Sequence, residues 1–132
     1  MRRLMLAVWV LTLSAHSNAA AAQSIAPDVF RALQMAQTAQ QAGKYTEAEQ
    51  ALNAVKTKPD SLEQALVWRS QGYLVWAQGH NKHAITLLDK ALRSNQLSAE
   101  QIAEDRLNLA KLSFSLKMMQ MEFVLHVKFL SI

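Results

Sequence analysis

Cysteine is absent from this 132-residue chain, and glycine and proline are scarce. Without cysteine the protein can form no disulfide and no cysteine-linked lipid anchor, so its fold must be stabilised by packing alone. Three glycines and two prolines are too few for the many turns of a β-rich fold. The length corresponds to about one domain. These absences favour a single all-α domain.

The first 22 residues have the layout of a secretory signal peptide. Arg2 and Arg3 precede a mostly apolar run over residues 4–13, and an alanine run ends at Ala22. Cleavage after Ala22, or at another nearby position of the alanine run, predicts an exported protein in the periplasm of a Gram-negative cell. If the segment were retained, residues 4–13 would instead anchor the chain in the inner membrane, although a full span takes about 20 residues.

The charge of the chain is only weakly basic once this segment is removed. The whole chain has 14 Lys plus Arg against 10 Asp plus Glu, a formal charge of +4. Two of those cations are Arg2 and Arg3, so the remaining chain has a charge of about +2. We therefore expect no nucleic-acid partner.

Turn and cap residues divide the first part of the mature chain into two expected helices. The first begins at Pro27, ends near residue 41 and is stopped by Gly43. The second is opened by a capping box of Thr46 with Glu49 and ends before Pro59. Ala, Leu, Gln, Glu and Lys dominate these segments and favour helix.

Three more helices are expected by the same signals. The third is capped either by Asp60 with Glu63 or by Ser61 with Gln64, and is stopped by Gly79. The fourth is capped by Asn81, and the fifth by Ser98 with Gln101. The expected unit is therefore a helix, a short turn and a helix, used at least twice.

The two units repeat with a period of 36 residues, because "AGKYTEAEQAL" aligns with "QGHNKHAITLL". The positions that carry the repeat are Gly43, Tyr45, Ala48 and Leu52 in the first unit, and Trp68, Gly72, Gly79, Ala84, Leu88 and Ala91 in the second. On these residues the chain resembles the tetratricopeptide repeat family, whose period is 34. The resemblance implies antiparallel helix-turn-helix repeats stacked as a short right-handed α-solenoid. It covers the domain 23–117, with repeats near 28–60 and 61–97 and a partial one at 98–117.

Residues 118–132 depart from the repeat and are expected to form an irregular tail. Phe123, Leu125, Val127 and Phe129 alternate with other residues, and no polar capping helix follows. We interpret this segment as an aggregation hazard or an unmet interface, for example one for self-association, in a shortened or frame-shifted version of a longer repeat protein. The alternative is a last helix that packs on Leu112 and Leu116.

No catalytic or metal-binding pattern is found. His80 and His83 stand three apart, but a metal site needs three or four ligands, and the repeat assigns both to a turn and a first helical turn. No metalloprotease, phosphate-loop or nucleophile-elbow motif occurs. We therefore predict no enzyme, no cofactor and no metal.

A partner-binding groove is the expected functional site. In the family that the chain resembles, the first helix of each repeat lines a concave groove for peptides or partner helices. The corresponding positions expected here are Gln37 and Gln40 in the first unit, Leu66, Arg69, Tyr73 and Trp76 in the second, and Leu107, Lys111 and Phe114 in the third. Cations beside aromatic rings suit an acidic or carboxylate-ended peptide. The other interpretation of the aromatic residues is ordinary core.

The resemblance implies a scaffold or adaptor of the cell envelope, such as an accessory protein of a TonB-type system, with a protein or peptide partner. One alternative is a periplasmic module that holds peptidoglycan or glycan fragments on Trp76 and Tyr73. Another is a membrane-tethered assembly factor that retains its amino-terminal segment.

Overall fold

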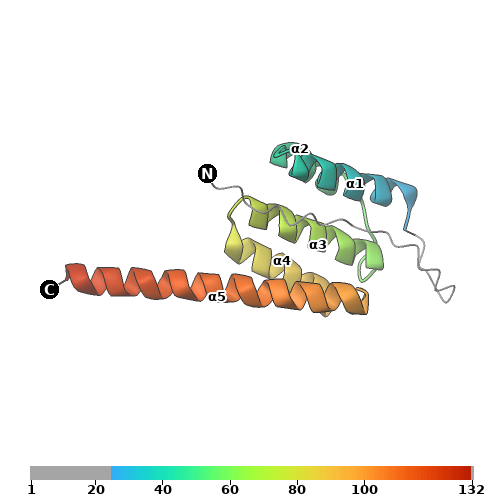
Figure 1. The fold of residues 1–132 in the computed structure, drawn as a ribbon. Coiled ribbons are helices and arrows are strands. Elements are labelled where there is room, and N and C mark those ends of the chain that lie inside the picture. The colour runs from blue at the N-terminus through green and yellow to red at the C-terminus, as the bar shows by residue number, and fades with distance from the viewer. Residues whose placement is uncertain (1–24, 132) are drawn as a thin grey trace.

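The protein is all-α over residues 25–131, the part of the chain that the computed structural model describes, and this part contains no strand (Figure 1). The predicted all-α fold with five helices is confirmed. The predicted signal peptide, residues 1–22, lies outside the described residues. The helices are α1 (Pro27–Gln41), α2 (Tyr45–Ala54), α3 (Leu62–Ala77), α4 (Asn81–Arg93) and α5 (Ala99–Leu130).

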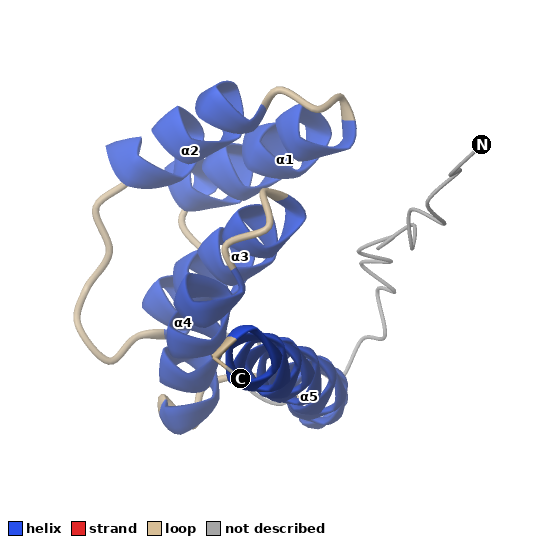
Figure 2. Ribbon diagram, turned by 90° about the vertical axis from the view of Figure 1, so that its left-hand side faces the viewer, coloured by secondary structure: helices blue, strands red, loops and turns tan. Residues whose placement is uncertain are grey.

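Two helical hairpins and a long final helix make up the molecule. Helices α1 and α2 pack together as one hairpin, α3 and α4 as the next, and α5 packs along α4. The first hairpin rests on α3, so the three layers follow the order of the chain (Figure 2). The carboxyl half of α5 projects well beyond the other helices (Figure 1).

Serine caps begin α3 and α5 as their sequence patterns indicate. The Ser61 hydroxyl accepts a hydrogen bond from the Gln64 backbone N–H at 3.1 Å. At α5 the Ser98 hydroxyl accepts from the Gln101 N–H, and the Gln101 side chain accepts from the Ser98 N–H. Of the two caps considered for α3, the Ser61 pair is therefore the one that forms.

The caps predicted for α2 and α4 are wrong, because a glycine turn starts each helix earlier. Gly43 and Gly79 have φ of +74° and +86°, a region that favours glycine. The next residue, Lys44 or His80, donates its N–H to a carbonyl five residues back, at 2.8 and 2.9 Å. These two residues are the N-caps, without a side-chain hydrogen bond. Thr46 therefore lies inside α2 and cannot be the N-cap residue of the predicted capping box.

The core is built from small residues on facing helices. Ala48 and Ala84 are completely buried, as are Leu88 and Ala91, and Leu52 is 2% exposed. Tyr45 and Trp68 are half-buried and pack against these clusters. All of these are residues that carry the repeat, so the 36-residue period coincides with a repeated pattern of burial.

Helix α5 corrects the prediction of an irregular tail over residues 118–132. The helix runs without a break to Leu130, because no glycine or proline follows Gly79. The alternation of Phe123 with Leu125 places the two side chains on roughly opposite faces of this helix. None of the described helices has the length and apolar content of a membrane span.

Replacing Gly72 by alanine tests the close packing of α3 on α4. A Cβ atom at residue 72 would lie 2.9 Å from Cγ of Leu88, which is fully buried and cannot move aside freely. Overpacking costs about 1–3 kcal/mol and should exceed the gain of about 1 kcal/mol in helix propensity. We expect Gly72→Ala to lower the free energy of unfolding, measured by urea denaturation.

The control is the same change in a Leu88→Ala background, where the clash is absent. There Gly72→Ala should be neutral or stabilising. If Gly72→Ala stabilises both backgrounds equally, the contact with Leu88 does not limit the packing.

Candidate functional site

A buried ion pair joins α3 to α5. Arg69 is 8% exposed, and its Nε donates to both carboxylate oxygens of Asp105 at 2.9 and 2.8 Å. Its Nη2 donates to Glu104 at 2.5 Å. Asp105 is completely buried. Burial would by itself lower the pKa of Arg69, but the hydrogen bonds and the charge of Asp105 outweigh it and raise that pKa above its usual value.

Tyr73 and Asn108 complete this polar cluster. The Tyr73 hydroxyl donates to Asp105 and accepts from Nδ2 of Asn108 at 3.1 Å. The Arg69 guanidinium lies 5.2 Å from the centre of the Tyr73 ring, a cation–π contact. Among the described residues, no buried side-chain nitrogen or oxygen lacks a hydrogen-bond partner. The cluster is therefore satisfied internally.

Arg69, Tyr73 and Trp76 share a face of α3, as their spacing indicates, but Arg69 is not a solvated cation. The Tyr73 and Trp76 rings stack with centroids 6.1 Å apart. Two carboxylates already neutralise Arg69, so an acidic peptide would have to displace Asp105 or Glu104 from it. The Tyr73 hydroxyl is likewise engaged by protein groups.

The residues predicted for the groove in the third unit do not lie beside Arg69 and Tyr73. They were aligned with the second unit at a spacing that differs from the 36-residue period of the repeat. A period of 36 residues takes Arg69 to Asp105 and Tyr73 to Leu109, which both lie towards the rest of the protein. Leu107 and Phe114 are instead 58% and 66% exposed, and Lys111 is also exposed. The opposite charges of Arg69 and Asp105, one period apart, were a signal of the pair that sequence reasoning missed.

The remaining predicted positions are distributed over the first three helices. Gln37 and Gln40 on α1 are half-buried. Leu66 packs against the core cluster that contains Ala65 and Ala91. Trp68, which the repeat assigns to the core, also carries the ammonium of Lys90 over its ring at 5.9 Å. None of these residues contributes to the exposed surface of α5.

One exposed apolar surface of the described chain is a line of side chains on the side of α5 turned away from helices α1 to α4, which we call the body. We call it the outer strip: Leu107, Phe114, Met118, Met121, Leu125 and Phe129, which are between 49% and 83% exposed. Their spacing of three, four or seven residues keeps them on one face of a helix. Leu112 is buried against Ala84 and Leu88 of α4 and lies about 200° from Phe114 around the helix.

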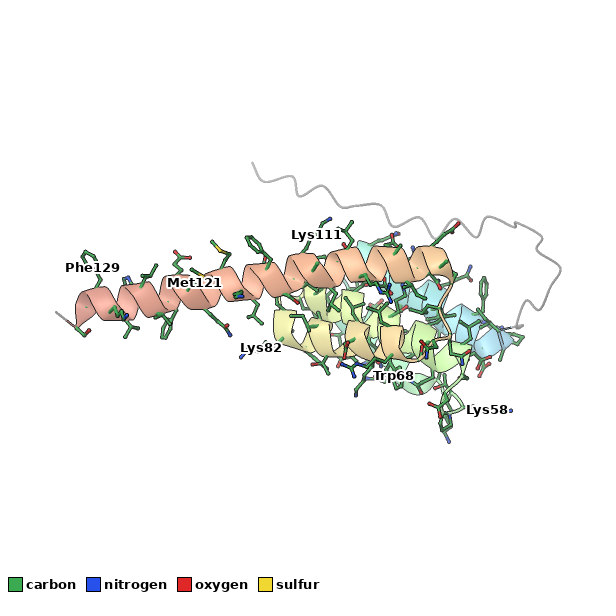
Figure 3. All side chains as sticks on the ribbon, turned by 90° about the horizontal axis from the view of Figure 1, so that it is seen from below. Lys58, Trp68, Lys82, Lys111, Met121 and Phe129 are labelled. Atoms are coloured by element: carbon green, nitrogen blue, oxygen red, sulfur yellow. The ribbon has the colours of Figure 1, made fainter. Side chains whose placement is uncertain are left out.

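A second apolar line continues the buried face of α5 past the end of the body. We call it the inner strip: Leu116, Met119, Phe123, Val127 and Leu130, of which Leu116 is half-buried and the others are exposed. Figure 3 shows the projecting part of α5, with Met121 and Phe129 on it and no other described helix beside it. This segment therefore carries apolar side chains on two faces.

His80 and His83 lie exposed at the start of α4. Within residues 25–131, no group of three or more His, Cys, Asp or Glu side chains could hold a metal ion. The surface of α5 is thus the feature of the described chain that points most clearly to a function.

Comparison with protein-family models, with curated proteins and with solved structures finds no match for this chain. The candidate site consequently rests on geometry and chemistry alone.

Asp105→Asn tests how much the buried pair stabilises the fold. The change leaves the buried Arg69 without its main counter-charge, and we expect a loss of about 3–5 kcal/mol in the free energy of unfolding. The matched control is Asp89→Asn, which removes a pair with Arg93 whose side chain is 79% exposed. Exposed pairs contribute about 0–1 kcal/mol. Equal losses in urea denaturation would show that Arg69 is well solvated without Asp105.

Tyr73 should resist ionisation. Burial, and then the hydrogen bond to Asp105, raise the pKa of Tyr73 well above its ordinary value. Because the folded pKa is the higher one, protonated Tyr73 stabilises the fold below about pH 10, and this stabilisation declines as the pH rises further. The chain has two tyrosines, so phenolate absorbance of a Tyr45→Phe variant reports on Tyr73 alone.

In that variant the native titration midpoint should lie above the midpoint measured in urea. Coincident midpoints in a chain that is still folded would mean that water reaches the hydroxyl.

Proposed function

We propose that the protein is a helical protein-binding module whose contact surface is the outer strip of α5. One observation carries the proposal: six large apolar side chains, each at least 49% exposed, line a single face of one helix. Soluble monomers rarely leave so large a contiguous apolar patch in water, and such patches mark interaction sites. Lys111 lies within the strip and adds a cation to this apolar face.

The interaction depends on apolar burial more than on charge. Arg69 was expected to bind an acidic peptide in the groove, but its guanidinium is already paired with Asp105 inside the protein. The outer strip carries Phe and Met, residue types that are enriched in the cores of interfaces. A partner that presents an apolar helix or strip would therefore bind better than an acidic peptide.

The cellular setting of the proposal follows from the sequence. A signal-peptide layout over residues 1–22 supports export, and the two repeated hairpins support a tetratricopeptide-like scaffold. We accordingly propose an adaptor of the bacterial cell envelope that works by holding another protein, for example within an energy-transducing machine of the TonB type.

Site-specific photocrosslinking tests this surface. We expect a photoreactive phenylalanine analogue at Phe114 to form a covalent adduct with a protein when the tagged chain is irradiated in an envelope extract. The same analogue at Lys82, an exposed position on α4, is the control and should give no adduct. Absence of any protein adduct from position 114 would overturn the proposed function.

A further inference from the structure

The outer strip follows a seven-residue repeat. From Leu107 to Leu125 its positions advance by four, three, four, three and four residues, with Lys111 inside the series. In the heptad notation abcdefg, Lys111, Met118 and Leu125 occupy a, while Leu107, Phe114 and Met121 occupy d. Apolar a and d positions are the seam through which two helices wind around each other.

Two opposite charges flank the seam at the positions that select a partner. Lys117 occupies g and Glu122 occupies the following e, five residues later, and both are exposed. In a parallel pair of helices, a g residue faces the next e residue of the other helix. Lys117 of each copy would therefore meet Glu122 of the other, giving two ion pairs about the two-fold axis. In an antiparallel pair g positions face g positions and e positions face e positions. Lys117 of one copy would then not face Glu122 of the other, and this ion pair would not form.

The body of the protein leaves this seam free. Asp105 and Leu112 face α3 and α4 from the opposite side of α5, and Asn108, at an e position beside the seam, donates to Tyr73 of α3. Two copies paired along the outer strip would therefore hold their bodies on the far sides of the coiled coil. Helix α5 has 32 residues and is about 48 Å long, so pairing can extend over more than three heptads.

Polar residues in the seam select one register. Lys111 lies at an a position and Lys128 at the d position after Leu125. A polar residue at an a position lowers the stability of a coiled coil but specifies register and oligomeric state. In the parallel pair these lysines bracket an uninterrupted apolar segment of Phe114, Met118, Met121 and Leu125.

The inner strip lacks this complementarity. Its edges carry Ser115 and Glu122 on one side and Ser113 and Gln120 on the other, with no lysine opposite the glutamate. Charge therefore distinguishes two strips of similar exposure, and it favours a copy of the same chain on the outer one.

We propose that the partner of the outer strip is a second copy of this chain, bound through α5 as a parallel two-stranded coiled coil. The inference rests on the proposed function, in which the outer strip is the protein's contact surface. In this dimer a coiled coil of two α5 helices joins the two bodies. Lys117 and Glu122 are the residues that make the two helices parallel.

Sedimentation velocity of the full chain without its signal segment tests the pairing. Met121 on the outer strip and Met119 on the inner strip are 53% and 59% exposed, so Met121→Glu and Met119→Glu are matched variants. We expect the unmodified chain and Met119→Glu to be dimers, and Met121→Glu to bind itself about tenfold or more weakly. Circular dichroism checks that both variants remain helical.

Two further variants test orientation. Lys117→Glu should weaken the dimer, and adding Glu122→Lys should restore it, because the exchanged charges face each other again. Since the chain has no cysteine, Leu125→Cys provides a single thiol. In a parallel pair the two thiols oppose each other and form an intermolecular disulfide, whereas in an antiparallel pair centred on the seam they lie more than a helical turn apart.

The outcomes separate this inference from the proposed function. A monomeric chain that still forms an adduct with a different protein from position 114 overturns the inference alone. A monomer without any adduct overturns both. A dimer that Met119→Glu dissociates and Met121→Glu does not would place the contact on the inner strip and also contradict the proposed pairing.

Discussion

The buried contact between Arg69 and Asp105 determines how the long last helix sits on the rest of the protein. Helix α5 packs mainly along α4 and reaches α3 through this contact and its neighbours Tyr73 and Asn108. A completely buried carboxylate needs a counter-charge and donors with good geometry, so only a narrow range of rotations of α5 satisfies Asp105. That rotation turns Leu107 and Phe114 towards water.

The rotation of α5 that Asp105 fixes leaves apolar side chains of this helix exposed to water. The first half of helix α5 packs against the body. The second half carries apolar side chains on two faces, with few charged residues between them. A helix of this composition gains stability only when another element covers it, since isolated helices derive little from propensity alone. The proposed coiled coil covers the outer face, where Lys117 and Glu122 supply a specific orientation.

Much of the fold could be predicted from local signals, and the errors have physical causes. Pro27, Ser61 and Ser98 mark helix starts because capping depends on neighbours in the chain. Thr46 matches a capping pattern but is displaced by the glycine turn before it, whose backbone hydrogen bonds start α2 at Tyr45. The irregular tail was a wrong prediction because alternating apolar residues do not break a helix, and no glycine or proline follows Gly79 to stop it.

The sequence by itself determined that five helices form, where most of them begin and end, and that Gly43 and Gly79 form the turns of the two hairpins. These features depend on residues within a few positions of each other. Only the tertiary structure decided that Arg69 is an internal counter-ion and that Leu107 and Phe114 face outwards. Both facts depend on which side of α5 meets α3 and α4, and that choice is made by a charge pair 36 residues apart in the chain.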